Sequence, residues 1–411
     1  MSGIGTTEIT EDTESTERLQ TRINSMTEVS SQSRLLKYYT LFGFFVIGVV
    51  TVLLGQVLPI LSGRLDLNDS QSGTLFLAQF GGSLLGTLFA VKHARRYGFV
   101  VTTLVGLIFM IAGLPGLNFS NFVVCWIAIF IYGCGLGLTI PAINLLTIET
   151  TPAEKQSSSI NLINFAWGVG AICSQPFVAA VSDGGSLVMA TLILDAALIL
   201  LALCFLSASR GVAHTNADEQ LLEPGNRIWH RPSAWLFILF GFCVIGIESG
   251  LGGWLTTYSE SLPARSINLT VVFFSFLVLG RGIASIISRR LSESVLISIC
   301  AVTLLTGIFL IVFGEGFATI GAAIAGLGTS AIFPTNMVRF SKIFGPAATR
   351  RATPLFIAGI AGSASLSWLI GIVSTSYGSL RFGLAVLLVS AFIVLILQFT
   401  IAAVHGRARS R

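Results

Sequence analysis

Charged residues are scarce in this sequence. They occupy 10% of its 411 positions, while hydrophobic residues occupy 53%. A soluble domain carries about 25% charged residues. The scarcity of charge therefore excludes an ordinary soluble domain, and the composition predicts a polytopic membrane protein instead.

The sequence also lacks the usual motifs of metal, nucleotide and catalytic sites. The six cysteines all lie in apolar stretches and form no CxxC pair, so we expect no disulfide framework and no metal site. No GxxxxGK(S/T) phosphate loop occurs, which argues against an ATP-driven step. The four histidines lie in polar connections or near the C-terminus, remote from any Ser or Cys nucleophile. We expect no enzyme and no cofactor.

From Lys37 onward the chain divides into twelve apolar segments. Each is close to the ~20 residues that span the hydrocarbon core of a bilayer. The sequence predicts an all-α polytopic membrane protein with twelve transmembrane helices. The expected bounds are 38–62, 70–92, 99–117, 120–147, 157–181, 186–208, 233–260, 268–289, 294–313, 316–341, 352–376 and 379–404.

The chain repeats itself about halfway along. Leu239–Gly246 (LFGFCVIG) matches Leu41–Gly48 (LFGFFVIG) at seven of eight positions, with an offset of 239 − 41 = 198 residues. A long polar interval separates the sixth and seventh segments. We therefore expect two pseudo-symmetric six-helix halves. The predicted parts are a disordered cytoplasmic tail (1–33), an N-terminal half (34–208), a cytoplasmic linker (209–232) and a C-terminal half (233–411).

Lysines and arginines are distributed unequally between the two sides of the predicted bundle. With a cytoplasmic N-terminus, twenty of them fall in cytoplasmic parts, and three fall in the opposite loops, namely Arg64, Arg265 and Arg381. The positive-inside rule then places both termini in the cytoplasm. We expect a multi-pass protein of the cell membrane, in which the +5 net charge reflects orientation and not a nucleic-acid partner.

One carboxylate, Glu248, lies inside the apolar stretch 239–262. A charge near the bilayer centre is costly, so such a residue faces a protein interior or a water-filled cavity and is a functional candidate. Burial favours the protonated carboxyl group, which suits a proton carrier. Arg281 in the next segment is the candidate partner, and a purely structural ion pair is the alternative. Asp195 in the sixth segment is the other acid, on a helix expected further from the cavity.

Polar and aromatic side chains on helix faces supply further candidates for a solute cavity. Segment 157–181 carries a stripe that includes Asn164 and Gln175, and segment 120–147 carries Asn144 on a face with two glycines. The remaining candidates are Gln56, Gln79, Trp167, Trp254, Tyr258 and Asn336. Helix packing is the alternative for each, because amides, tryptophans and small residues also serve as packing or anchoring groups in membrane helices.

The segment count, the repeat, the central linker and the basic connections between segments two and three and between eight and nine together resemble the major facilitator superfamily. The resemblance covers about residues 38 to 404 and implies two halves that rock around a site at the midplane. The superfamily's motif in the two–three connection is degenerate here. Gly86 and the basic residues are present, whereas the acidic residue is missing.

Within that superfamily, the run from Gly135 to Pro176 is similar to the fucose/glucose:proton symporter family. The matching positions are Asn144, Ile160-Asn161, Asn164, Gly170-Ala171 and Pro176, followed by Gly246-x-Glu248, Gly253-Trp254, Tyr258 and Gly280-Arg281. The resemblance implies that Asn164 and Trp167 contact sugar, although Trp167 stands where the family commonly has Asn. The fucose branch carries an acid at the position of Ile140 and another in helix one, and both are missing here.

These observations predict a secondary active transporter that moves a small polar solute by alternating access. The resemblance implies a monosaccharide, a hexose, with proton coupling through Glu248 and Arg281. The alternative is an efflux transporter for amphipathic drugs or lipids, which would have a wide cavity lined by aromatic residues and methionines. A receptor or scaffold would need large soluble loops. The expected partners are the solute, a proton or sodium ion, and the lipid bilayer, around a monomer.

Overall fold

The computed structural model of the chain describes residues 35–182, 184–207, 228–262, 267–288, 290–314, 316–345 and 352–404, apart from the side chains of Ala153 and Ser157. Across these ranges it contains eleven helices that are long and apolar enough to cross a membrane. The predicted tail (1–33) and residues 209–227 of the predicted linker lie outside the described residues.

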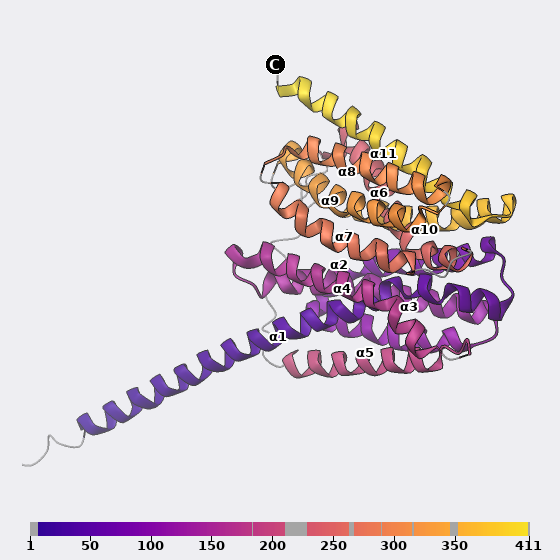
Figure 1. The fold of residues 1–411 in the computed structure, drawn as a ribbon. Helices are drawn as coiled ribbons and strands as arrows, with labels where there is room; N and C mark the ends of the chain where they lie inside the picture. The colour runs from indigo at the N-terminus through magenta and orange to yellow at the C-terminus, as the bar shows by residue number, and fades with distance from the viewer. Residues whose placement is uncertain are drawn as a thin grey trace, which may run out of the picture.

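The helices of each half lie side by side in one bundle, and the two bundles stack on each other (Figure 1). The first half contains α1 (Thr7–Leu65), α2 (Asp69–Gly113), α3 (Phe122–Glu149), α4 (Gln156–Val181) and α5 (Val188–Ser209), with the short 3₁₀ helices η1 (Leu114–Asn118) and η2 (Ala153–Lys155). The second contains α6 (Pro232–Glu260), α7 (Leu269–Ile287), α8 (Glu293–Phe313), α9 (Ala318–Phe344), α10 (Thr353–Tyr377) and α11 (Leu380–Arg409).

The predicted all-α architecture of twelve membrane segments is confirmed, because α2 and the following η1 together contain two of them. These are segments 70–92 and 99–117, and they join at Gly98, whose backbone has φ 83° and ψ 165°. That conformation is open almost only to glycine, which has no Cβ. Gly98 therefore breaks the helical path between the second and third segments without a separate loop.

The repeated octapeptide has a packing role in each half. A Cβ on Gly48 of α1 would overlap the carbonyl oxygen of Trp167 in α4, and a Cβ on Gly246 of α6 would lie 2.8 Å from the carbonyl oxygen of Gly362 in α10. The glycine that ends both copies thus lets α1 approach α4 and α6 approach α10. Small residues at such crossings are how membrane helices pack closely.

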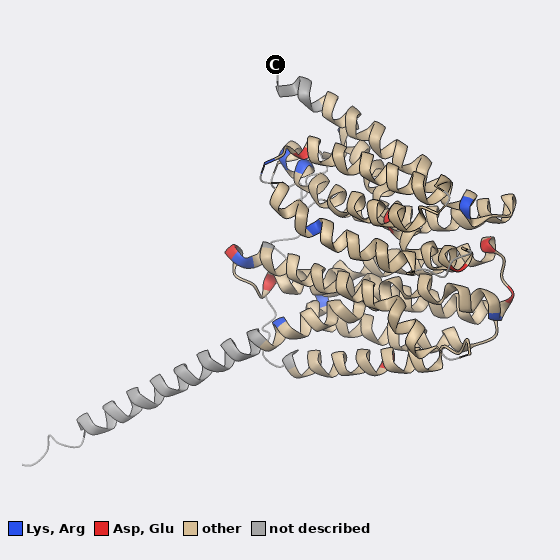
Figure 2. Ribbon diagram, in the orientation of Figure 1, with Lys and Arg blue, Asp and Glu red and all other residues tan. Residues whose placement is uncertain are grey.

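The two ends of the bundle differ in charge. We call the end at which Leu35 and Val404 lie the terminal end, and the opposite end, where α1 ends and α2 begins, the far end. The blue positions on the ribbon, which mark Lys and Arg, gather mainly at the terminal end in Figure 2, and the far end carries Arg64 and Arg381 beside several acids. The predicted orientation would make the terminal end cytoplasmic.

The halves meet along α1 with α6, α2 with α10 and α4 with α7. At the far end, the backbone N–H of Ser70 donates to the hydroxyl oxygen of Thr375 at 2.8 Å. The hydroxyl of Ser374 donates to the carboxylate of Asp69. A Cβ on Gly371 would overlap the carbonyl oxygen of Asp69, so α2 and α10 touch through their backbones there.

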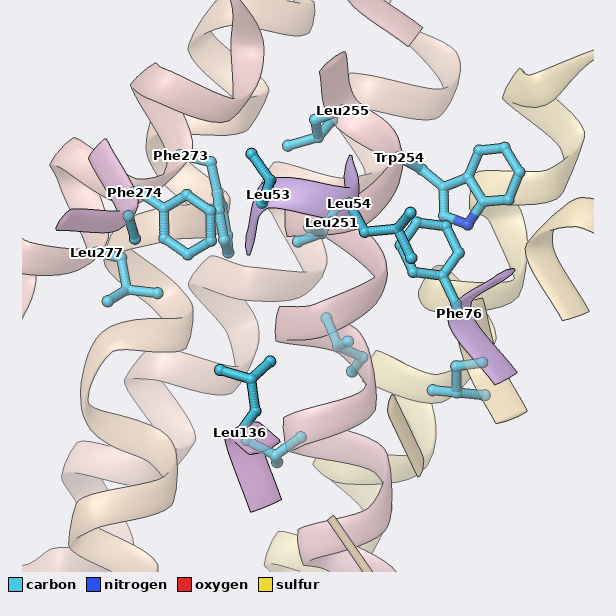
Figure 3. Packing of buried hydrophobic residues seen from close by; sticks show 14 of the residues in the cluster. Leu53, Leu54, Phe76, Leu136, Leu251, Trp254, Leu255, Phe273, Phe274 and Leu277 are labelled. Atoms are coloured by element: carbon cyan, nitrogen blue, oxygen red, sulfur yellow. The ribbon is translucent and has the colours of Figure 1, made fainter. Parts of the chain in front are cut away.

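A cluster of large apolar side chains fills the junction between the halves (Figure 3). We call it the apolar plug, and it consists of Leu53, Leu54, Phe76, Leu251, Trp254, Leu255, Phe273 and Phe274. The rings of Phe76 from the first half and Trp254 from the second lie 5.6 Å apart. Both side chains are fully buried, so the two halves pack closely against each other at this level.

Candidate functional site

An ion pair lies midway along the bundle, on the terminal side of the apolar plug. Nη2 of Arg281 in α7 is 3.7 Å from Oε1 of Glu248 in α6. This distance is too long for a hydrogen bond. The side chains of Arg281 and Glu248 are 32% and 19% exposed. The pair is therefore loose and partly open.

The guanidinium of Arg281 has unused donors. Its Nε–H is buried without an acceptor among the described residues. Buried polar groups in native proteins nearly always have a partner, so this donor is available to a water, an ion or a ligand. The carboxylate of Glu248 also makes no hydrogen bond to a described side chain or backbone group beyond its contact with Arg281.

The first half contributes Trp167 of α4 to this site. The guanidinium carbon of Arg281 lies 6.0 Å from the centre of the Trp167 ring, within the range of a cation–π interaction. The ring centre of Trp167 lies 6.3 Å from that of Phe274 in the plug, with the two rings nearly perpendicular. The indole N–H donates to the hydroxyl of Thr51 in α1 at 3.4 Å. Trp167 thus joins the ion pair of one half to the other half.

Gln79 lies behind Trp167, inside the first half. Its amide nitrogen donates to the carbonyl oxygen of Thr51 at 2.8 Å, and its amide oxygen accepts from the hydroxyl of Tyr132 at 3.1 Å. The residue is 2% exposed. In this conformation Gln79 holds α1, α2 and α3 together and is remote from any open surface.

Gln56 bridges the two halves on the far side of the plug. Its amide nitrogen lies 3.4 Å from the carbonyl oxygen of Gly252, and its amide oxygen accepts from the hydroxyl of Thr256 at 2.6 Å. Thr256 in turn contacts the hydroxyl of Thr270 at 2.9 Å. This buried network fastens α1 of the first half to α6 and α7 of the second.

Three further predicted residues are buried and have protein partners. The indole N–H of Trp254 donates to the carbonyl oxygen of Ser367 at 2.9 Å, inside the apolar plug. The hydroxyl of Tyr258 donates to the carbonyl oxygen of Ile311 in α8 at 3.1 Å. Asn336 of α9 is fully buried, and its amide oxygen accepts from Arg339 at 2.7 Å. None of these residues borders the ion pair in this conformation.

The remaining predicted amides keep part of their surface exposed. The amide nitrogens of Asn144 and Asn164 donate to the carbonyl oxygens one turn earlier, at 2.9 and 2.8 Å, which leaves their side-chain oxygens without a partner among the described residues. Asn164 precedes Trp167 by one turn of α4, so it lies closer to the terminal end than Trp167 does. It is therefore on the same side of the apolar plug as Arg281. Gln175 is half-buried and lies further along α4 toward the far end.

The acid that rivals Glu248 lies elsewhere. Asp195 belongs to α5, which packs against α1 and α2 of its own half. It is 9% exposed, and its Oδ1 has no partner among the described residues. The structure thus brings together Glu248, Arg281 and Trp167, with Asn164 one turn away, and places Asp195 on a peripheral helix.

Two residues of these networks carry no signal in the sequence. Thr51 and Thr256 are threonines in apolar helices, where the usual expectation is a hydrogen bond to the helix's own backbone.

Arg339 stands out in the sequence only as a basic residue near a helix end. It is 5% exposed, donates to Gln398 of α11, and lies 5.4 Å from the ring centre of Phe237 in α6. It therefore fastens helices of the second half to one another.

The chain matches one family model in sequence and shares its fold with several solved structures. The family model described as Major Facilitator Superfamily matches residues 40–356. A D-xylose-proton symporter has a similar structure, with TM-score 0.69 and 16% identity over 89% of this chain and 96% of that one. The E. coli fucose:proton symporter has a TM-score of 0.60 and 17% sequence identity, with 89% of this chain and 98% of that chain covered. The nucleoside transporter NupG has a TM-score of 0.67 and 14% sequence identity, with 90% of this chain and 99% of that chain covered. No curated protein matches the chain in sequence.

Proposed function

The chain belongs to the major facilitator superfamily, and we propose that it is a secondary active transporter of a small polar solute, a monosaccharide, coupled to protons through Glu248. The observation that carries the proposal is the loose ion pair between Glu248 and Arg281 midway through an apolar bundle, in contact with Trp167 of the opposite half. Charged side chains at such depth mark ion and substrate pathways.

The arrangement of the halves supports alternating access. Secondary transporters of this type bind solute near the midplane, between two halves that rock against each other. Here the apolar plug and the network of Gln56 lie on the far side of the ion pair, and Asn164 lies on its terminal side. With the terminal end in the cytoplasm, the conformation is closed toward the outside.

Protonation of Glu248 would couple the ion pair to this motion. A neutral carboxyl group no longer attracts the guanidinium, so Arg281 becomes free to interact with solute or with Trp167. Because Trp167 belongs to the first half and Arg281 to the second, that change alters the attraction between the halves. The partly exposed oxygens of Asn164 and Asn144 are suited to sugar hydroxyls. The sugar and nucleoside relatives support this solute class and lend no support to the efflux alternative.

The test is uptake of a panel of labelled hexoses into proteoliposomes, with and without an inward proton gradient. Wild type is expected to accumulate at least one hexose only with the gradient, and Glu248→Gln to equilibrate it without accumulation. Asp66→Asn, which changes an exposed acid in the first loop, is the matched control and should behave as wild type. Undiminished accumulation in Glu248→Gln would remove Glu248 from coupling, and export of amphipathic compounds alone would support the efflux alternative.

A further inference from the structure

We propose that the solute carries a carboxylate, which Arg281 binds, and that this carboxylate competes with Glu248 for the guanidinium. The inference rests on the proposed transport function and narrows its solute to a sugar acid with a pyranose ring, a hexuronate. Three observations carry it, namely the donors of Arg281, the charge balance of the site, and the ring of Trp167 beside it.

The first observation is that Glu248 leaves much of the guanidinium unused. Arginine offers five N–H groups in a planar fork, which matches the two oxygens of a carboxylate. Here the single contact to Glu248 is 3.7 Å long, and the Nε–H is buried without an acceptor in the described part of the chain. A hydroxyl of a neutral sugar would satisfy one such donor. A carboxylate would satisfy two and would also neutralise the charge.

The second observation is the isolation of the pair from other ionisable groups. Among the described residues of helices that pack against α6 or α7, the other ionisable groups are Lys37, Tyr38, Tyr39 and Arg64 in α1, Cys173 in α4, Arg339 and Lys342 in α9, Tyr377 in α10 and Arg381 in α11. All of them except Cys173 lie toward helix ends. On α6 itself they are Cys243, Tyr258 and Glu260. The charge at the midplane is therefore decided by Glu248 and Arg281.

The charge balance links the solute to the proton. The empty site is neutral when Glu248 is ionised, and adding an anion to it would leave an uncompensated negative charge. When a proton converts the carboxylate of Glu248 to a carboxyl group, the site becomes positive, and an anion restores neutrality. A neutral sugar would instead leave Arg281 uncompensated at a depth where charge is costly. Proton and anion therefore bind together, and each raises the affinity of the other.

The third observation favours a sugar acid over a small organic anion. The guanidinium lies over the ring of Trp167, so a carboxylate on Arg281 places the rest of the solute near an aromatic surface. The side-chain amide oxygen of Asn164, one turn of α4 before Trp167, can accept a hydrogen bond from a hydroxyl of the solute. A pyranose ring has both an apolar face and hydroxyls, whereas a short hydroxy acid such as lactate has no ring to place there.

The test is titration calorimetry of the full chain in nanodiscs with D-glucuronate, D-glucose and L-lactate. Measurements in two buffers of different ionisation enthalpy give the protons taken up on binding. We expect wild type to bind a sugar acid with proton uptake, and more weakly as pH rises. Glu248→Gln should bind it without proton uptake and independently of pH. Arg281→Gln should lose at least about 30-fold in affinity, since the enclosed carboxylate of the solute would then lack its charged partner, a loss of ~2 kcal/mol or more.

The glutamine variant at Glu248 keeps the test decisive, because retained or tighter binding cannot result from misfolding. Arg281→Lys, which keeps the charge, should retain weakened binding with proton uptake. Binding of D-glucose with an affinity unchanged in Arg281→Gln would overturn the sugar-acid assignment and leave the proposed sugar transport intact. Preference for L-lactate would overturn the assignment to a sugar acid. If no compound binds and none is taken up by proteoliposomes, the proposed function itself fails.

Discussion

At single positions, the close approach of helices depends on residues that have no side chain. Gly82 of α2 faces α3 so closely that a Cβ would overlap the carbonyl oxygen of Phe130, whereas a Cβ on the adjacent Gly81 would lie 3.9 Å from the Phe130 ring. Gly82→Ala is therefore expected to lower stability by about 1–3 kcal/mol, the usual cost of overpacking. Gly81→Ala should be neutral or slightly stabilising. Thermal unfolding in detergent compares them, and equal midpoints would contradict the packing described.

Residues of the site differ in how far the sequence reveals them. Glu248 and Arg281 were predictable because a charge in an apolar segment stands out, and their pairing follows from lying on consecutive segments. Gln56 and Gln79 look alike in sequence, since both are amides in apolar helices. The structure gives them different partners, across the halves for Gln56 and within one half for Gln79. Helical periodicity shows a face but not the helix it meets, so these roles needed the structure.

Among the elements, α2 depends on one backbone conformation. Gly98 has φ 83°, and a side chain in this region costs on the order of 1–3 kcal/mol. We expect Gly98→Ala to lower the thermal midpoint and the yield of folded protein. Gly63→Ala is the control, because Gly63 lies in the helical part of α1 with nothing near its missing Cβ. A midpoint for Gly98→Ala equal to that of the control would show that the junction does not require glycine.

The junction of α1 and α6 at the far end depends on the amide of Gln56. Gln56→Leu removes its bonds to Gly252 and Thr256, each worth about 1 kcal/mol. The far-end-closed conformation should then be less populated, and hydrogen exchange should rise in the far-end turns of α1 and α6. Gln79→Leu is the matched control, because it also removes a buried amide but breaks bonds inside one half. Equal exchange changes at the far end in both variants would refute a bridging role specific to Gln56.

The elements themselves were largely predictable. Hydropathy marks each span because lipid requires a long apolar stretch with its backbone bonds satisfied inside the helix. The predicted bounds 233–260 and 294–313 differ by one residue at the start from α6 (Pro232–Glu260) and α8 (Glu293–Phe313). The exception is α2, where the basic stretch around Arg95 and Arg96 indicated a loop. The structure instead continues as helix on both sides of Gly98.

For the whole molecule, the repeat predicted two halves, but neither hydropathy nor the repeat indicates which end of the bundle is closed. That depends on contacts such as Ser70 with Thr375 and Phe76 with Trp254, which join residues far apart in the chain.

The charge balance at Glu248 and Arg281 also has a consequence at this scale. One proton moving with one monovalent anion carries no net charge, so D-glucuronate uptake should be independent of membrane potential. D-glucuronate uptake that rises with an inside-negative potential set by potassium and valinomycin would instead indicate that more than one proton enters with each anion.

The central claim is that solute and proton cross together because Glu248 carries the proton. The most direct measurement is the internal pH of proteoliposomes that contain a pH-sensitive dye, after D-glucuronate or D-glucose is added outside with no initial pH gradient. Wild type should acidify the interior as solute enters, beyond the change in protein-free liposomes, and Glu248→Gln should admit solute without acidification. Solute entry through wild type with no acidification, or equal acidification through Glu248→Gln, would contradict the account.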